Sequence, residues 1–329
     1  MIHINLVAQC KLNDILILFF YIYIFHAFIF KMNFICIMKM LSVVFLHCSM
    51  ILGMGCGVHD VVDNSAPFEQ VPESFKIVSG VMDEASGIAE SKLNPGYLWT
   101  EQDSGAPPEL ALIDTKGNFV KKIFIKNAEN RDWEDLTIGP GPEKDKPYIY
   151  IADIGDNGHR HALSYFYRLT EPAVSTDTVL NSEKISFVYT DGPRDAEAFL
   201  VDHNSLDIYI ITKKENRSRI YKLAYPQSTQ HIDTAFLVGE LPFKGAVSAA
   251  VSNDGKEIII KTYKKLYYWT KPKDENIASA LTRRPINIGY KKERQGEAIC
   301  FANDGSCFFT LSEKPLFASE VSLQCYRRK

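Results

Sequence analysis

The sequence lacks the short motifs by which several classes of enzyme are recognised. It contains no G-x-S-x-G elbow of a serine hydrolase, no H-E-x-x-H zinc motif and no phosphate-binding P-loop. It also contains no C-x-x-C pair, and its cysteines and histidines are not spaced as in a zinc site. The motifs therefore do not decide whether the chain is an enzyme.

An excess of charge of one sign is also missing. The 329 residues include 37 Lys and Arg against 40 Asp and Glu, which gives a formal net charge of −3. A protein that binds nucleic acid needs a basic surface to neutralise phosphates. The composition therefore argues against nucleic acid as a partner.

Cysteine is scarce beyond the N-terminal part of the chain. After Cys56 only Cys300, Cys307 and Cys325 remain. Cys300 and Cys307 flank a predicted turn, so they could form a disulfide in an oxidising compartment or pack as small buried side chains. The sequence leaves both alternatives open.

Long apolar runs occur only near the N-terminus, and the run at 40–54 has the layout of a signal peptide. Lys39 precedes it and Cys56 follows it. The segment 38–55 resembles a bacterial lipoprotein signal, which predicts export, lipidation of Cys56 and anchoring in membrane lipid on the periplasmic or outer-membrane face of the cell envelope. Leu52 stands four residues before the cysteine rather than three, so simple export or a retained anchor is the alternative.

A second apolar run, at 15–30, precedes this signal. We expect residues 1–37 to be an over-extended reading frame, with the true start at Met32 or Met38. The alternative is a membrane segment, although 16 residues fall short of the ~20 that span a bilayer. Residues 56–73 are interpreted as a linker.

After Cys56, apolar residues do not recur at the spacing of an amphipathic helix. Instead, a sequence pattern repeats about every 50 residues. Each repeat begins with an acidic or hydroxyl residue, a small or acidic residue and then apolar residues. The five copies begin at Ser86, Glu134, Glu197, Ser248 and Glu297.

Further short runs rich in β-branched and aromatic residues follow each copy, bounded by Gly, Pro, Asn and Asp. This pattern predicts an all-β fold, a β-propeller of five four-stranded blades over residues 74–329. A sixth blade is the alternative if the insertion at 172–182 hides one. The fifth repeat lacks its last strand, so we expect the strand at 75–78 to close the ring and remove the free edges. We expect a monomer.

Three of the copies share the pattern Arg-x-x-Glu, which pairs Arg131 with Glu134, Arg194 with Glu197 and Arg294 with Glu297. In a propeller the first strand of each blade lines the channel, so the three Glu side chains should converge. Crowded carboxylates repel each other unless a cation, a proton or a guanidinium compensates. The Arg and Glu residues could pair from blade to blade, hold Ca²⁺ or another hard cation, or bind or act on a substrate.

The loops after the second strands should bring more polar groups to the same mouth, namely Glu101, Asp103, Lys213, Tyr263 and Glu313. Lys213 and Tyr263 join the three Arg and three Glu residues as ligand-binding candidates. The loop at 153–157 is the densest in acidic residues, so Asp153 and Asp156 join the three Glu residues as metal-ligand candidates. Asp, Gly and Asn are also the ordinary residues of turns.

The ordered motifs Asp132-Trp133-Glu134-Asp135-Leu136, Asp153-Ile154-Gly155-Asp156-Asn157, Asp195-Ala196-Glu197-Ala198 and Gln295-Gly296-Glu297-Ala298 resemble a family of uncharacterised exported bacterial β-propellers. That family is distantly similar to phytase-like and esterase-like propellers, which implies a site at the channel mouth and calcium. We therefore expect an envelope-anchored protein that binds a small molecule, a glycan or a protein partner there. The alternatives are a Ca²⁺-type hydrolase of phosphate or carboxylic esters or lactones, and a protein-interaction scaffold.

Overall fold

The structure is a computed structural model that describes residues 66–78, 80, 82–314 and 320–329. The chain divides into two compact units, Met1–Val61 and Val62–Lys329, and all described residues belong to the second. The predicted signal peptide, the lipidation at Cys56 and the N-terminal segment at 1–37 lie outside the described residues. Within the described part, no helix has the length and apolar composition of a membrane span.

The described strands pair into antiparallel groups of four. The first group contains β2 (Ala85–Glu90), β3 (Tyr97–Gln102), β4 (Glu109–Asp114) and β5 (Phe119–Ile125). The second contains β6 (Trp133–Pro140), β7 (Pro147–Asp153), β8 (Ser164–Thr170) and β10 (Glu183–Tyr189). The third contains β11 (Ala196–Val201), β12 (Ile208–Thr212), β13 (Arg219–Leu223) and β14 (Asp233–Glu240).

The last two groups complete the ring. The fourth contains β15 (Ala246–Val251), β16 (Glu257–Thr262), β17 (Leu266–Thr270) and β18 (Ile286–Ile288), and the short helix α3 (Ile277–Leu281) lies between β17 and β18 in the chain. The fifth contains β19 (Gly296–Phe301), β20 (Cys307–Ser312), β21 (Glu320–Arg327) and the N-terminal strand β1 (Glu73–Val78).

Two parallel pairings extend the outer edges of these groups. The insertion at 172–182 holds the two-residue strand β9 (Thr178–Val179), which pairs with β5 of the first group. Strand β14 pairs with β10, so the second and third groups form one eight-stranded sheet. The predicted all-β propeller fold is confirmed, whereas the number of blades stays a prediction because of this merging.

Strand β1 closes the ring as expected. It pairs antiparallel with β21 along its whole length, from Glu73 opposite Cys325 to Val78 opposite Glu320. This pairing covers an edge whose backbone groups would otherwise be unpaired. Cys300, Cys307 and Cys325 are buried free thiols in these last strands, so the alternative of small buried side chains holds.

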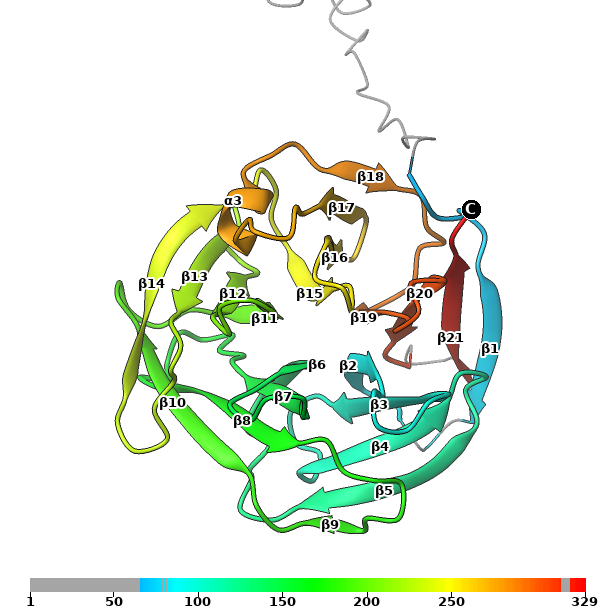
Figure 1. Ribbon diagram of the computed structural model, residues 1–329, viewed down its shortest axis with the longest axis horizontal. Helices are drawn as coiled ribbons and strands as arrows, with labels where there is room; N and C mark the ends of the chain where they lie inside the picture. The colour runs from blue at the N-terminus through cyan, green and yellow to red at the C-terminus, as the bar shows by residue number, and fades with distance from the viewer. Residues whose placement is uncertain (1–65, 79, 81, 315–319) are drawn as a thin grey trace, which may run out of the picture. The chain divides into compact units, whose positions relative to one another are not determined.

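The core consists of five clusters of buried apolar side chains, and each cluster takes its members from two neighbouring groups. The first strands of the groups lie innermost (Figure 1). They are buried on both faces, which explains why they read as nearly continuous apolar runs. All six residues of β11 are buried, whereas the outermost strand β14 exposes Phe236, Leu237 and Val238.

Candidate functional site

A β-bulge at the start of each first strand determines which side chains meet. The pairing of every first strand with its second strand skips one residue at the same place, and the skipped residues are Ser86, Glu134, Glu197, Val247 and Glu297. A bulge leaves one residue unpaired and re-aims side chains locally. The three predicted Glu residues therefore occupy equivalent positions at one end of the ring.

A second set of side chains follows the ends of the second strands. Gln102, Thr212, Thr262 and Ser312 each pair with the residue just before a bulge. The next residues in the chain therefore lie at the same end of the ring, and these residues are Asp103, Lys213, Tyr263 and Glu313. The strand register thus brings together the polar side chains that the sequence predicted at one end of the channel.

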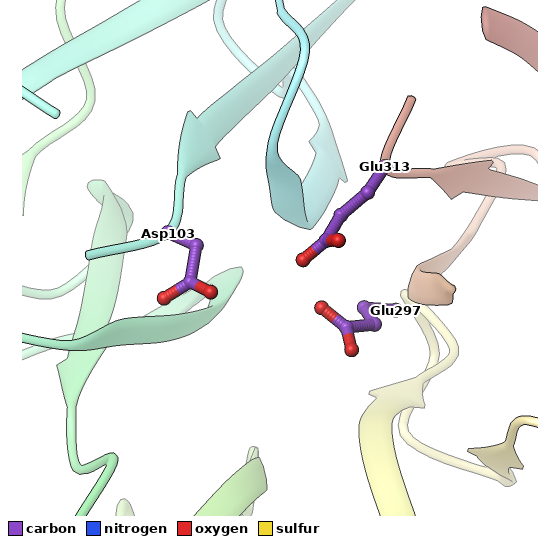
Figure 2. A group of neighbouring side chains, drawn as sticks. All are labelled: Asp103, Glu297 and Glu313. Carbon is purple, nitrogen blue, oxygen red and sulfur yellow. The ribbon is translucent and has the colours of Figure 1, made fainter. Parts of the chain in front are cut away.

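Seven carboxylates at this end form what we call the acidic cluster: Glu101, Asp103, Asp132, Glu134, Glu197, Glu297 and Glu313. Within it, one oxygen each of Asp103, Glu297 and Glu313 lie within 4.8 Å of one another, and these carboxylates turn toward each other (Figure 2). Asp103, Asp132 and Glu134 form a second trio with the same spacing. Asp103 belongs to both trios and so links them.

Crowding and burial raise the pKa of most of these carboxyls. Burial and a hydrogen bond with Glu297 raise the pKa of Glu313 to about 9. Burial raises the pKa of Glu101 to about 8, and burial together with nearby Asp residues raises that of Asp132 to about 6. Burial and the charge of Glu197 raise the pKa of Glu134 well above its usual value. Without a cation, several members of the cluster therefore keep a proton near neutral pH.

Glu134 lacks a partner, as do the buried Oε2 atoms of Glu101 and Glu197 among the described residues. Glu134 is 5% exposed, yet among the described residues its carboxylate has no hydrogen bond and no ion pair. Gly155 lies directly against it, since a Cβ atom at Gly155 would stand 2.2 Å from Glu134 Oε1 and 2.4 Å from Asp132 Oδ2. The absence of a side chain at Gly155 thus leaves room for these two carboxylates.

Lys213 is the basic side chain that reaches into the cluster. Its ammonium forms an ion pair with Glu197 and donates to the Tyr263 hydroxyl at 3.2 Å, and that hydroxyl donates to Glu297. Burial alone would lower the pKa of Lys213, but the charge of Glu197 raises it. One ammonium offsets only a small part of the charge that the cluster would carry when ionised.

The predicted Arg residues do not pair with the Glu residues of the ring. Arg131 binds Asp153 at 3.2 Å and lies over the Tyr165 ring. Arg194 binds Asp191 at 2.7 Å, and Arg294 is exposed. The interpretation that these Arg and Glu residues lock the ring from blade to blade is therefore wrong, because nearer carboxylates bind Arg131 and Arg194, and Arg294 is exposed.

The acidic loop at 153–157 contributes a glycine to the cluster rather than its own carboxylates. Asp153 is engaged by Arg131. Asp156 accepts the backbone N–H groups of Arg160 and His161, each at 2.8 Å, and these bonds lower its pKa despite its partial burial. The two trios contain Glu134 and Glu297 but not Glu197, Asp153 or Asp156. The other members of the trios are Asp103, Asp132 and Glu313.

The chain matches no protein-family profile and no curated protein. Among solved structures, it is similar to hydrazine synthase of Kuenenia stuttgartiensis, with a TM-score of 0.39 and 12% sequence identity. The match covers 74% of this chain and 71% of that one. Function therefore rests on the chemistry of the site itself.

Proposed function

We propose that the protein binds a hard divalent cation of the Ca²⁺ type at the acidic cluster, and that this cation holds a small oxygen-rich molecule or a glycan. The observation that carries the proposal is Glu134, a buried carboxylate without a partner that belongs to a trio of carboxylates. Ca²⁺ takes six to eight oxygen ligands in flexible geometry. The trio of Asp103, Asp132 and Glu134 offers three carboxylates to such a cation, and Asp103 shares a second trio with Glu297 and Glu313.

The location that we propose follows from the sequence. The chain would be exported and held at the bacterial cell envelope through a lipid on Cys56. Calcium sites of extracellular modules are commonly weak, with Kd of about 10⁻⁴ to 10⁻³ M. A site assembled from crowded carboxyls that must first lose protons suits that range, because proton release costs part of the binding energy.

Hydrolysis of phosphate or carboxylic esters or lactones is a second candidate, and one observation favours it. The cluster combines candidate cation ligands with Glu101, a carboxyl outside both trios whose pKa is raised by burial to about 8 in the cation-free protein. A cation polarises an ester oxygen, and a positioned carboxylic acid can donate a proton to the leaving group. If the protein neither binds a cation nor hydrolyses esters or lactones, the remaining alternative is a protein-interaction scaffold.

The test is a calcium titration of chelator-treated protein, followed by calorimetry and by thermal unfolding. We expect saturable binding, and at 100 times Kd the bound cation should add about 2.7 kcal/mol to the free energy of unfolding. Glu134→Gln should abolish most of both effects, because it removes a charged ligand.

Glu69→Gln is the matched control, since Glu69 is exposed and lies outside the cluster. It should bind calcium as the unchanged protein does. Absence of binding at millimolar calcium, or equal binding by the Glu134→Gln variant, would remove the proposal. Turnover of ester or lactone panels that requires calcium would establish the second candidate.

A further inference from the structure

The opposite end of the ring carries a groove that the acidic cluster does not share. The acidic cluster lies where the first strands begin, whereas the groove is lined by the loops that follow the ends of these strands. It has a volume of about 860 Å³ and is lined among others by Lys92, Lys144 and His203, and also by the acidic residues Glu143 and Asp145. Glu143 forms an ion pair with Lys146 at 2.7 Å. That size falls in the usual range of small-molecule sites.

A buried network through the centre of the ring separates the two ends. Asp135 is fully buried on β6 and accepts hydrogen bonds from Ser248 Oγ at 3.0 Å and from the backbone N–H groups of Ala249 at 3.2 Å and Phe199 at 3.4 Å. Ser248 Oγ in turn accepts the N–H of Ile299 at 3.2 Å. Four of the first strands are thus joined, so a ligand in the groove would be independent of the acidic cluster.

Lys92 brings an uncompensated charge to the groove. Among the described residues its ammonium has no hydrogen bond and no ion pair. Burial lowers its pKa, although the charge of Glu171 raises it. Glu171 is already occupied, because its oxygens accept hydrogen bonds from the Ser91 hydroxyl, the Trp99 indole and the backbone N–H groups of Lys92 and Leu93.

His203 complements Lys92 at the same place. Burial, and then the charge of Lys92, lower the pKa of His203 to about 4. Its imidazole is therefore neutral at pH 7 and offers a hydrogen bond without adding a charge. A half-buried ammonium without a direct ion-pair partner is unfavourable, and an anion bound in the groove would reduce that cost.

The wall of the groove is held in place before any ligand arrives. The loop at 139–147 packs so tightly that a Cβ atom at Gly141 would stand 2.1 Å from the Tyr148 ring. The Tyr150 hydroxyl donates to the Pro140 carbonyl at 2.7 Å. Three prolines, Pro140, Pro142 and Pro147, also restrict the loop. A wall fixed in this way loses little conformational freedom on binding.

We propose that this groove binds a small molecule through its oxyanion group, a carboxylate or a phosphate, with Lys92 as the charge partner and His203 as a hydrogen-bond partner. The proposal is independent of the cation site. It assigns a second ligand site to the protein, of opposite charge preference and on the opposite end of the ring.

The test is a calorimetric titration of chelator-treated protein at pH 7 and constant ionic strength, with inorganic phosphate in one arm and succinate in the other. We expect at least one anion to saturate. Lys92→Met should weaken its binding at least about tenfold, because the charged partner is lost. Lys92→Arg keeps the charge and should bind within about threefold of the unchanged protein.

Two control variants make the outcome specific. Lys116→Met removes an exposed charge from the β4–β5 turn and should leave the affinity unchanged. Glu134→Gln should lose calcium binding but keep anion binding, so the two proposals can fail separately. If neither anion saturates, or if Lys92→Met and Lys116→Met behave alike, the groove is not an oxyanion site.

Discussion

The two ends of the ring share the same strands but carry opposite chemistry. At the end where the first strands begin, bulges and second-strand ends gather seven carboxylates around one lysine. At the end where they finish, the ammonium of Lys92, unpaired among the described residues, lines a groove beside the imidazole of His203. The strands are similar at both ends, so the difference lies in one bulged residue per strand and in the loops. A repeated scaffold can thus present two different sets of charged side chains, with a buried network between its ends.

The largest effect on stability should come from breaking the buried network around Asp135 that lies between the two ends. Asp135→Ala leaves buried N–H groups on β6, β11 and β15 and the Ser248 hydroxyl without their acceptor. We expect a loss of about 3 kcal/mol in the free energy of unfolding, measured by urea denaturation. Asp274→Ala, at an exposed position, is the control and should change stability little. A loss below about 1 kcal/mol for Asp135→Ala would show that the network does not hold the ring together.

The next largest effect should be confined to the acidic cluster. Gly155→Ala places a methyl group against Glu134 and Asp132, so these carboxylates must move. We expect a loss of about 1–3 kcal/mol in stability and calcium binding at least roughly tenfold weaker, measured by denaturation and calorimetry.

Gly158→Ala is the matched control for this change. Its methyl group would meet only the Arg160 side chain, which is exposed and can move. Anion binding in the groove should be the same in both variants. Normal calcium binding by Gly155→Ala would mean that the tight contact at Gly155 does not position the cation ligands.

The smallest effect, at most about 1.4 kcal/mol per pH unit for each group, should be a pH dependence of opposite sign at the two ends. Burial raises the pKa of Glu313 from 4.5 to about 9, so its contribution to the stability of the cation-free protein is present below pH 4.5 and is lost as pH rises toward 9. Burial lowers the pKa of His203 from 6.5 to about 4, so its contribution is present above pH 6.5 and is lost as pH falls toward 4. The two contributions oppose each other between pH 4.5 and 6.5, so thermal unfolding should show little change there and a fall in stability above pH 6.5.

Single variants assign each contribution. Glu313→Gln should flatten the alkaline limb above pH 6.5, and His203→Gln should extend that limb down to about pH 4.5, because the opposing contribution is lost. Calcium should also reduce the alkaline loss, because the cation takes the place of the protons. An alkaline limb that survives unchanged in Glu313→Gln would mean that other carboxyls of the cluster, such as Glu101, dominate it.

Most of the fold could be predicted from the sequence repeat. Apolar runs at a regular spacing predict the strands, and the unmatched run at 75–78 predicts the closing strand, because both are set by burial and by edge pairing. The convergence of Glu134, Glu197 and Glu297 follows from the same spacing. The parallel pairing of β14 with β10 could not be predicted, since it depends on how neighbouring outer edges approach in space.

The site was less accessible to prediction for two physical reasons. A bulge is a register shift between two strands, so a single sequence does not show that Asp103 and Glu313 complete a trio with Glu297. Long side chains such as Arg131 and Arg194 bind the nearest carboxylate, and that choice depends on distances rather than on motif spacing. The groove at the other end could not be predicted, because the connection between β6 and β7 has the composition of an ordinary turn.

The closing strand has a consequence for how the molecule is made. Glu73 on β1 and Arg327 on β21 form an ion pair although 254 positions separate them in the chain. A contact of such long sequence separation is costly to form and slows folding. While the chain is being synthesised, β1 has no partner until β21 has emerged, so we expect this pairing to form after those of the strands between them.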